Sequence, residues 1–454
     1  MISCDKLPIV SGADELTGHV QEFQKDPLAL FQRAAREAGD IAHLRFGPYP
    51  FYLINHPEYI ERILVHDYKK FIKPSMNEWR QLLGLGLITS EGERWMRERK
   101  MIQPAFVPRR VNDYTAMILE KTRAISRKWQ DGKSLDLFEE MKKITLSVAL
   151  QAFFGYKTTF DFEIVTASLQ RIMDYIYDVN ANPQKSVNDP TRLAAFEQDI
   201  QRLDDMVYTI MQTKQEEAGP EEGEDLLSML LVKAKEEDHP IGPQQIRDEV
   251  ITHLIAGYES TATSLAWTFY LLAQHPEAEA ALLAEMERVL AGRDPEPADI
   301  EKMYYASGVF AESLRLYPPS WSVVRMAAEP FELGEHHFPK GTQVFMSTYV
   351  MHRSIKYYDN PDAFRPERWS GGLGRQLPTY AYFPFGGGPR ICIGRGMAML
   401  EAFLVIVTLY REHRFTLMPD RPVEPIAKIT LQPRTGIWMT VEKRKTSNLS
   451  GVGL

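Results

Sequence analysis

Hydrophobic residues recur mostly at intervals of three and four between about Arg94 and Val250. This spacing is typical of amphipathic helices, so we expect this part of the chain to be helical with connecting loops. Two loops are the clearest: Val179–Thr191 is polar and contains two prolines, and Glu216–Asp225 is acidic.

One long helix is predicted from Pro243 to Gln274, because its apolar stripe continues until His275-Pro276. A helix of this length spans roughly 48 Å and crosses a whole domain. Its midpoint contains Gly257, which costs on the order of 1 kcal/mol relative to alanine, followed by Glu259 and Ser260. Polar and small residues at the centre of a buried helix do not favour packing, so we expect them to have a function.

Strand-like patterns occur near both ends of the chain, so we predict a mainly α fold with minor β structure. No repeat or flexible linker divides the sequence, and we expect one domain over residues 1–454, with a lead-in over about residues 1–40 and a loose tail over about residues 445–454. The remaining predicted elements are strands at Ile41–Phe46 and Phe51–Asn55, helices at Ala278–Leu290, before Leu316 and after Met397, β structure within Phe331–Met351, and a strand pair within Ile429–Glu442.

Composition narrows the class of protein. The chain has 454 residues, of which 44% are hydrophobic and 25% charged, and a net charge of −8, which excludes a disordered chain and argues against a nucleic-acid binder. It begins without an apolar targeting segment, and its two cysteines, Cys4 and Cys392, are too few for a disulfide framework or a four-cysteine metal site. We expect a soluble, cytoplasmic protein without a membrane anchor.

Cys392 lies in a loop rich in glycine rather than in a helix or strand pattern. Gly386–Gly388 precede it, and Gly394 follows it before the helical pattern begins. Glycines allow the backbone to approach another group closely. The amides of the following helix and the charge of Arg390 are expected to lower the pKa of the thiol. This context indicates a functional cysteine.

The segment Phe385-Gly-Gly-Gly-Pro-Arg390-Ile-Cys392-Ile-Gly394 matches the haem-binding signature of the cytochrome P-450 superfamily, Phe-x-x-Gly-x-Arg-x-Cys-x-Gly. The resemblance implies a single large fold with a triangular helical body, small sheets and a long central helix over the haem. It also implies haem b as cofactor, Cys392 as the axial ligand of its iron, and cofactor contacts from Phe385, Arg390 and Gly394.

A second resemblance concerns charged residues. An i, i+3 pair such as Glu312 and Arg315 is by itself typical of a surface salt bridge. Here it is followed by Phe364-Arg-Pro-Glu-Arg368-Trp369, which resembles the family segment that completes a buried network. The resemblance assigns Glu312, Arg315 and Arg368 to a structural triad that fixes the cysteine loop.

The segment Ala256-Gly-Tyr-Glu-Ser-Thr261 resembles the family's oxygen-binding stretch. By this resemblance, Ala256 and Gly257 leave room beside the haem, and Glu259 and Ser260 relay protons to bound dioxygen, so both are catalytic candidates together with Cys392. Ser260 stands where threonine is usual, which leaves the coupling of oxygen activation to substrate oxidation open. The alternative is that the Ser260 hydroxyl only bonds to the carbonyl four residues earlier.

The resemblance also assigns residues around the haem and the substrate. Trp95, Arg99, Arg325 and Arg390 match positions that meet the haem propionates, although a single arginine such as Arg325 is commonly just exposed. Six residues are placed around a hydrophobic substrate such as a fatty acid, terpenoid or steroid: Ile88, Ala256, Ser320, Val323, Val324 and Ile429. Arg171 and Lys185 are candidates for binding a substrate carboxylate, with surface cations as the alternative.

The activity implied is monooxygenation: one atom of O2 enters the substrate by hydroxylation or epoxidation, with electrons from a separate ferredoxin or flavodoxin and its NAD(P)H reductase. The segment between Glu91 and Arg110 contains six cations and three anions, and this excess of positive charge suits docking of an acidic partner. The alternative is a solvated helix face with Arg99 turned inward.

Three other classes of haem protein are alternatives. They are a peroxide-driven enzyme, a haem-thiolate isomerase or dehydratase, and a non-enzymatic protein that binds a gas or carries electrons. The pair Glu259 and Ser260 argues against the first two, and the absence of a sensory or DNA-reading segment argues against the third.

Overall fold

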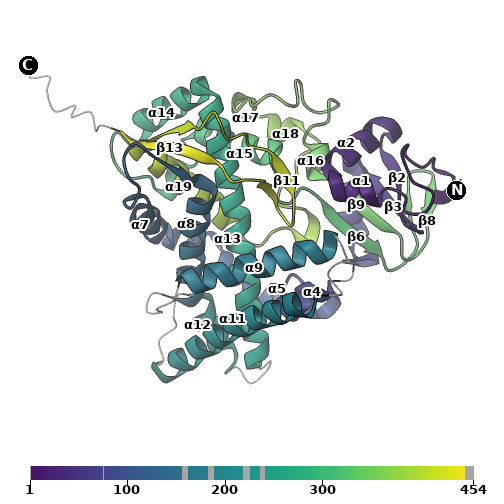
Figure 1. Ribbon diagram of the computed structural model, residues 1–454, viewed down its shortest axis with the longest axis horizontal. Coiled ribbons are helices and arrows are strands. Elements are labelled where there is room, and N and C mark those ends of the chain that lie inside the picture. Colours follow the sequence, from purple (N-terminus) through teal and green to yellow (C-terminus); the bar gives the residue numbers. More distant parts are fainter. Residues whose placement is uncertain are drawn as a thin grey trace, which may run out of the picture.

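A helical body and a strand-rich part lie side by side, and α13 (Pro243–Gln274) runs through the helical body (Figure 1). The computed structural model describes residues 2–74, 76–155, 162–181, 189–217, 225–235 and 241–444. The other helices are α1 (Val20–Lys25), α2 (Pro27–Ala38), α3 (Pro57–Glu61), α4 (Asn77–Leu83), α5 (Gly92–Ile102), α6 (Pro108–Asp113), α7 (Thr115–Ser126), α8 (Leu137–Phe154), α9 (Phe162–Ala181), α11 (Pro190–Glu217), α12 (Leu226–Lys233), α14 (Pro276–Leu290), α15 (Tyr304–Leu316), α16 (Thr348–Met351), α17 (Glu367–Ser370), α18 (Leu373–Gln376) and α19 (Arg395–Glu412).

Small sheets accompany these helices. The largest has five strands in the order β2-β3-β9-β6-β4, with β3 and β9 parallel and its other neighbours antiparallel. Further sheets have the orders β1-β8-β7, β10-β13-β5 and β11-β12. The strands are β1 (Ile2–Ser3), β2 (Ile41–Phe46), β3 (Tyr49–Ile54), β4 (Phe71–Ile72), β5 (Lys133–Asp136), β6 (Val323–Ala327), β7 (Phe331–Leu333), β8 (His336–Phe338), β9 (Gln343–Met346), β10 (His413–Leu417), β11 (Pro425–Ala427), β12 (Leu431–Pro433) and β13 (Trp438–Lys443).

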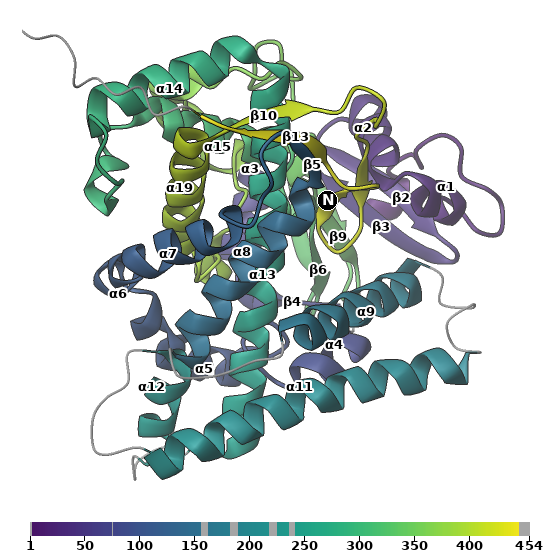
Figure 2. The same cartoon turned by 60° about the vertical axis from the view of Figure 1, so that its left-hand side comes forward.

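The long helix is confirmed with the bounds that the sequence predicts. Pro243 lies in its first turn, where the amide that proline lacks would have no partner within the helix. At the other end the amide of His275 bonds to the Leu272 carbonyl, and Pro276 follows. Helices α8, α11, α15 and α19 all pack against α13 and bury most of its length. Figure 2 shows α9 and α11 side by side across one end of it.

The mainly α fold with small sheets is confirmed, but three local predictions are wrong. The two strands within Ile429–Glu442 do not pair with each other, because β12 pairs with β11 whereas β13 lies between β10 and β5. Strand β5 interrupts the stretch predicted as helical, and Phe331–Met351 ends in the short helix α16. Pairing with distant segments decides these short elements, and local sequence patterns do not record it.

Three predictions fall partly or wholly outside the described residues. The loop at Val179–Thr191 begins with the end of α9 and finishes with the start of α11, and residues between them lie outside the description. Residues 218–224 of the acidic loop and the tail at 445–454 also lie outside it.

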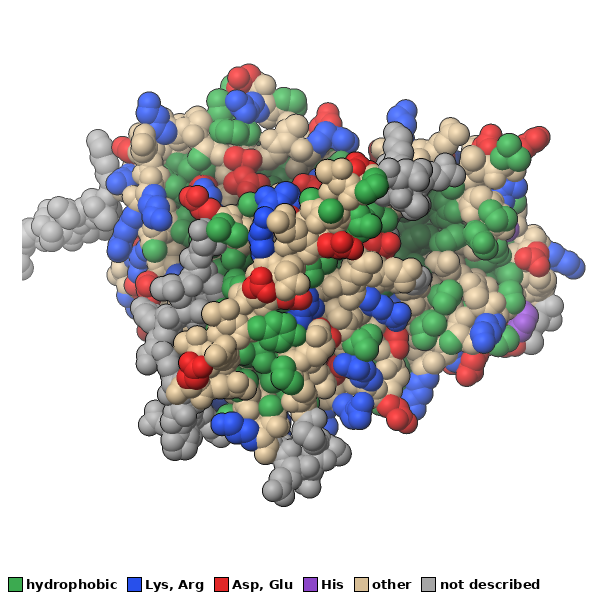
Figure 3. Space-filling view, turned by 60° about the horizontal axis from the view of Figure 1, so that its bottom comes forward, with side chains coloured by type: hydrophobic (Ala, Val, Ile, Leu, Met, Phe, Trp, Pro, Cys, Tyr) green, Lys and Arg blue, Asp and Glu red, His purple; other side chains and the backbone are tan. Residues whose placement is uncertain are grey.

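On the face drawn in Figure 3, blue and red side chains are interspersed with green ones, and hydrophobic side chains line a recess. In the described part of the chain, no helix combines the length and the apolar character needed to cross a bilayer.

Candidate functional site

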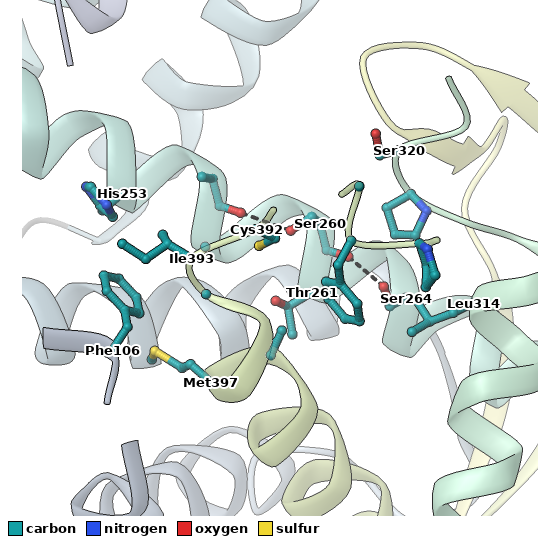
Figure 4. A pocket seen from close by; sticks show the side chains of 18 of the residues that line it. Phe106, His253, Ser260, Thr261, Ser264, Leu314, Ser320, Cys392, Ile393 and Met397 are labelled. Atoms are coloured by element: carbon teal, nitrogen blue, oxygen red, sulfur yellow. Dashed lines mark hydrogen bonds between the residues drawn. The ribbon is translucent and has the colours of Figure 1, made fainter. Parts of the chain in front are cut away.

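A cavity of about 340 Å³ separates α13 from the loop that leads into α19. Figure 4 shows Cys392, from this loop, and Ser260, from α13, on the wall of the same cavity. The wall is mostly apolar, and α8, α15 and β6 contribute to it as well. The sequence-predicted residues that line it are Ala256, Gly257, Ser260, Ser320, Val323, Arg325, Phe385, Arg390, Cys392 and Gly394.

The cysteine loop needs its glycines. Gly388 has a φ of +64°, and a Cβ there would lie 1.9 Å from the carbonyl oxygen of Leu64. A Cβ at Gly387 would lie 2.3 Å from the ring of Tyr380. The Cys392 amide donates to the Phe385 carbonyl at 3.0 Å, which closes the loop with the cysteine at the cavity. Substitution of either glycine would therefore displace the cysteine.

The predicted low pKa of the Cys392 thiol is wrong for the chain alone. Burial raises the pKa, whereas the amides of Gly394 and Arg395 and the charges of Arg99 and Arg395 act in the opposite direction and are smaller. Arg390, which was expected to help, pairs with Glu91 instead. The accessible surface of the cysteine faces the cavity deep in the protein, so desolvation disfavours the thiolate unless a cation in the cavity compensates it.

The α13 wall has little bulk beside the cysteine. Ala256 and Gly257 contribute almost no side chain, and a Cβ at Gly257 would lie 3.3 Å from the ring of Phe153. The Ser260 hydroxyl donates to the Ala256 carbonyl at 2.9 Å, which is the alternative that the sequence left open. Ser264, one turn later, bonds to the Ser260 carbonyl in the same way. Both hydroxyl oxygens can still accept hydrogen bonds at the cavity wall.

Glu259 is not brought to the cavity together with Ser260. Its Oε1 atom accepts hydrogen bonds from Thr430 Oγ1 and Gln432 Nε2, both at 2.7 Å, on the side of α13 that faces β12. Consecutive helical residues project about 100° apart, so the two side chains face different surroundings. Burial raises the pKa of Glu259, although the bonds from Thr430 and Gln432 lower it.

Cations gather at one end of the cavity. Arg390 donates twice to the Ser90 carbonyl, and the half-buried Arg325 donates to the Val324 carbonyl. Burial and the charge of Arg390 lower the pKa of Arg325 to about 10. Lys73 lies beside them, and burial together with both arginines lowers its pKa to about 7.

This cation cluster, Lys73, Arg325 and Arg390, has an excess of positive charge. The charge of Glu91 acts on all three, and its carboxylate pairs with Arg390 and accepts from the Lys73 amide. A half-buried cluster of this kind is stabilised by anions that enter the cavity. Two propionate groups would supply that charge.

Trp95 and Arg99 flank the cavity from α5 rather than lining it. The guanidinium of Arg390 lies 4.4 Å from the centre of the Trp95 ring, and Arg99 donates to the Ile391 carbonyl at 2.9 Å. These contacts hold the cysteine loop: Trp95 contacts Arg390, and Arg99 bonds to Ile391, the residue before Cys392.

The predicted triad is brought together in full. Arg315 donates to both carboxylate oxygens of Glu312 at 2.7 and 2.8 Å, and Arg368 donates at 3.1 Å. Trp369 adds a bond at 2.9 Å. Glu312 and Arg315 have no exposed side-chain surface, and Arg315 also donates to three backbone carbonyls, those of His352, Pro361 and Ala363.

Three residues predicted for the substrate pocket lie outside the wall of this cavity. Ile88 accepts a bond from Lys73 through its carbonyl, Val324 packs against an aromatic cluster beside the five-stranded sheet, and Ile429 packs against the main core. Arg171 pairs with the buried Asp199 at 2.6 Å and its side chain is half exposed, which supports the alternative that it is a surface cation. Lys185 lies outside the described residues.

The sequence analysis missed several side chains at or beside the cavity. Lys73 belongs to no motif, His253 is hidden in the apolar stripe of α13, and Thr261 and Ser264 were given no role. Glu401 is a buried carboxyl that lines the cavity, and burial alone raises its pKa to about 8. The signal that could have found it is a single glutamate inside the apolar run of the last predicted helix.

These residues fit haem b. The cavity offers one thiol, a wall of small residues on α13 and a cluster of half-buried cations at its end. They match an iron ligand, space for a ligand on the other face of the haem and partners for the propionates. The residues that would hold the group are Cys392, Arg325, Arg390 and Lys73, with Phe385 and Gly394 beside it.

Comparisons with known proteins agree with this assignment. The model of the Cytochrome P-450 family matches residues 13–440. Among curated relatives, cyclooctatin synthase of Streptomyces melanosporofaciens is 32% identical, covering 93% of each chain. Cyclooctat-9-en-7-ol 5-monooxygenase of the same organism is 33% identical over 90% of this chain and 89% of that protein. Pentalenene oxygenase of Streptomyces avermitilis is 29% identical over 92% and 94%.

A solved structure extends the likeness to three dimensions. The heme domain of cytochrome P-450DA superposes with a TM-score of 0.86 at 25% sequence identity, covering 96% of this chain and 99% of that chain. Fold, signature and relatives agree over nearly the whole sequence. The chain therefore belongs to the cytochrome P-450 family, the oxidoreductases that use haem b for monooxygenation.

Proposed function

We propose that the substrate of this monooxygenase is a terpenoid, which it hydroxylates or epoxidises. The observation that carries the proposal is the mostly apolar cavity between Cys392 and the small residues of α13. Such walls favour burial of a hydrocarbon skeleton, at about 25 cal/mol per Å² of apolar surface. Three Streptomyces relatives support the terpenoid class, since their names refer to cyclooctatin, cyclooctat-9-en-7-ol and pentalenene.

Cys392 is proposed as the axial ligand. The bound haem supplies the oxygen chemistry, and its ferric charge compensates the desolvation of the thiolate. Arg325, Arg390 and Lys73 are proposed to hold the propionates. The triad around Glu312 is proposed as the support of the segment that carries the loop.

Glu259 and Ser260 are proposed as the acid and the alcohol that move protons to the cavity. Ser260 presents its hydroxyl oxygen to the cavity while its proton bonds to the Ala256 carbonyl. Glu259 would have to exchange its bonds to Thr430 and Gln432 for one that faces the cavity. Its raised pKa favours a carboxyl that can donate a proton.

A separate, acidic electron donor is proposed to dock at α5 and α6. Arg97, Lys100 and Arg109 are exposed there, and the apolar side chains of Met96 and Val107 are 47% and 39% exposed. Exposed cations together with exposed apolar side chains suit an acidic ferredoxin or flavodoxin. Helix α5 also contacts the cysteine loop through the Arg99 side chain, so a donor docked there would be close to the haem ligand.

The test of substrate class is an absorption titration of the ferric, haem-loaded protein with cyclic terpenes, fatty acids, steroids and an azole. The azole should bind to the iron and establish an accessible pocket. A low-to-high-spin shift with terpenoids alone supports the proposal. A shift with fatty acids or steroids but not with terpenoids would overturn the terpenoid class.

Two variants test the residue roles. Cys392→Ser should lose the thiolate-type absorption of the ferrous carbon monoxide complex, and its retention would contradict the ligand assignment. Ser260→Ala should divert electrons to peroxide, whereas Ser264→Ala, which removes the neighbouring hydroxyl, is the matched control. Equal peroxide release in both would remove the proton role of Ser260. Substrate turnover by hydrogen peroxide without any donor would favour the peroxide-driven alternative.

A further inference from the structure

Two buried carboxyl groups lie near the cavity at a place that the proposed function does not use. Glu98 of α5 and Glu249 of α13 are 1% and 0% exposed. Glu98 Oε1 accepts from Arg94 at 2.7 Å, and Glu249 Oε2 accepts from the Leu87 amide at 3.2 Å. The second oxygen of each, Glu98 Oε2 and Glu249 Oε1, has no hydrogen-bond partner among the described residues.

The two residues, which we call the acid pair, differ in their charged partners. Two neighbouring buried carboxylates cannot both be ionised at neutral pH without a large electrostatic cost. Glu98 forms an ion pair with Arg94. Burial and then the charge of Glu98 raise the pKa of Glu249 to about 8, so Glu249 is the member that holds a proton at neutral pH.

His253 links the acid pair to the cavity. Its Nδ1 atom lies 3.7 Å from Glu249 Oε2 and 2.7 Å from the Glu249 carbonyl oxygen, to which it donates. The ring also lines the cavity beside Phe106 (Figure 4). Burial lowers the pKa of His253 to about 4, so the ring is neutral at neutral pH.

Glu98 of the acid pair is connected to solvent through its ion pair with Arg94. The side chain of Arg94 is 37% exposed and lies on the helix proposed for docking of the electron donor. The acid pair therefore connects α5, which carries Glu98, with α13, which carries Glu249 and forms part of the cavity wall.

Among the residues that the structure describes, few charged groups act on Glu249 and His253. The charged or titratable groups that act on Glu249 and His253 come from α5 and α13, and they are Arg94, Glu98, Arg99 and Asp248. The 3₁₀ helix at Gln103–Phe106 and α8 contribute the uncharged rings of Phe106 and Phe153. In such surroundings a change of charge in the cavity is poorly screened.

We infer that the acid pair, connected to the cavity by His253, takes up one proton when the bound haem is reduced. In this step an external donor gives one electron to the haem, and Glu249, where its carboxylate is ionised, binds one proton from solvent to become a carboxylic acid. The negative charge added in the cavity raises the proton affinity of groups nearby, and in a dry interior this coupling is strong. The inference requires haem binding and is independent of the terpenoid substrate.

The test is the reduction potential of the haem-loaded protein, measured by spectroelectrochemistry at pH values on either side of the Glu249 pKa of about 8. The wild-type potential should fall as the pH rises through that value. Glu249→Gln, which mimics the protonated acid in shape, should lose this slope. Glu93→Gln removes an exposed carboxylate from α5, the helix that carries Glu98, and should keep the slope.

An unchanged slope in Glu249→Gln overturns the inference. Glu98→Gln is a second variant, which removes the charge that raises the pKa of Glu249 and should move the slope to lower pH; a slope at the wild-type pH would show that the two groups are not coupled. His253→Phe copies the neighbouring rings and should weaken the slope, and an unchanged slope there would remove the link through His253.

Proton uptake gives an independent readout. On photoreduction in weak buffer, followed with an indicator dye, wild type should take up more protons than Glu249→Gln near the Glu249 pKa, and equal uptake would overturn the inference. A protein that shows the slope but no spin shift with terpenoids keeps the inference and loses the proposed substrate.

Discussion

Two buried charge clusters differ in how completely they are satisfied. Around Glu312, donors reach both carboxylate oxygens, from the side chains of Arg315, Arg368 and Trp369 and from the Arg365 amide. In the acid pair of Glu98 and Glu249, two oxygens are left without a partner among the described residues. The first cluster has a hydrogen-bond donor for each carboxylate oxygen, so it favours one geometry. The second leaves one oxygen of each carboxyl group unpaired, which is the observation behind the proposed proton uptake.

Arg315→Ala is the strongest way to break the satisfied cluster. It leaves the Glu312 carboxylate buried and undercompensated, which is expected to cost about 3–5 kcal/mol of unfolding free energy. Denaturant unfolding and the haem content of the purified protein measure the effect. Arg365→Ala is the control, because that side chain is 42% exposed and its amide contact to Glu312 persists. Equal losses in the two variants would contradict the comparison.

Glu401→Gln tests a buried carboxyl group that, like the acid pair, has an oxygen without a hydrogen-bond partner. Glu401 Oε1 has none among the described residues. Its pKa is raised from 4.5 to about 8 in the folded chain. The folded state therefore holds the proton more tightly than the unfolded state. The stabilisation from this group is complete below about pH 4.5 and is lost as the pH rises through about 8.

Glutamine does not ionise, so the Glu401→Gln variant does not lose this stabilisation as the pH rises. At about pH 8 it should gain on the order of a few kcal/mol relative to wild type, and at about pH 5 much less. Urea unfolding of the purified protein at both pH values measures the difference. A gain of the same size at both would contradict the raised pKa.

Glu259 is intermediate between the fully bonded Glu312 and the incompletely bonded acid pair. Its Oε1 accepts two hydrogen bonds, and these only partly offset the rise in pKa that burial causes. Gln432→Leu removes one donor and should cost about 1–2 kcal/mol of stability. It should also raise the pKa of Glu259 further, and so move the pH dependence of peroxide release during turnover to higher pH. A stability equal to wild type would show that the bond to Gln432 contributes nothing.

Arg171→Ala should have the smallest effect. Asp199 keeps its contacts with Ser168 and Arg202 when Arg171 is removed, and the Arg171 side chain is 51% exposed. We expect a loss of at most about 1 kcal/mol in urea unfolding. Affinity for any spin-shifting ligand should stay unchanged, and a selective loss of carboxylate ligands would restore its role as a substrate anchor.

Much of the site follows from short sequence segments. The full length of α13 follows from local spacing and residue type, and the segments around Cys392, Glu312 and Arg368 are identified by their resemblance to family motifs. A tight loop requires glycine at Gly387 and Gly388, and a helix that ends at His275-Pro276 has a chemical stop signal. Features of this kind depend on neighbours in the chain, so the sequence predicts them.

Only the tertiary structure decided where side chains turn and which distant groups they meet. Glu259 and Ser260 are adjacent in sequence but project about 100° apart on the helix, so packing against β12 takes Glu259 away from the cavity. Lys73 reaches the cation cluster, and Glu98 reaches Glu249, across large separations in sequence. The pKa values of buried groups such as Cys392 depend on desolvation, which is a property of the assembled core rather than of local sequence.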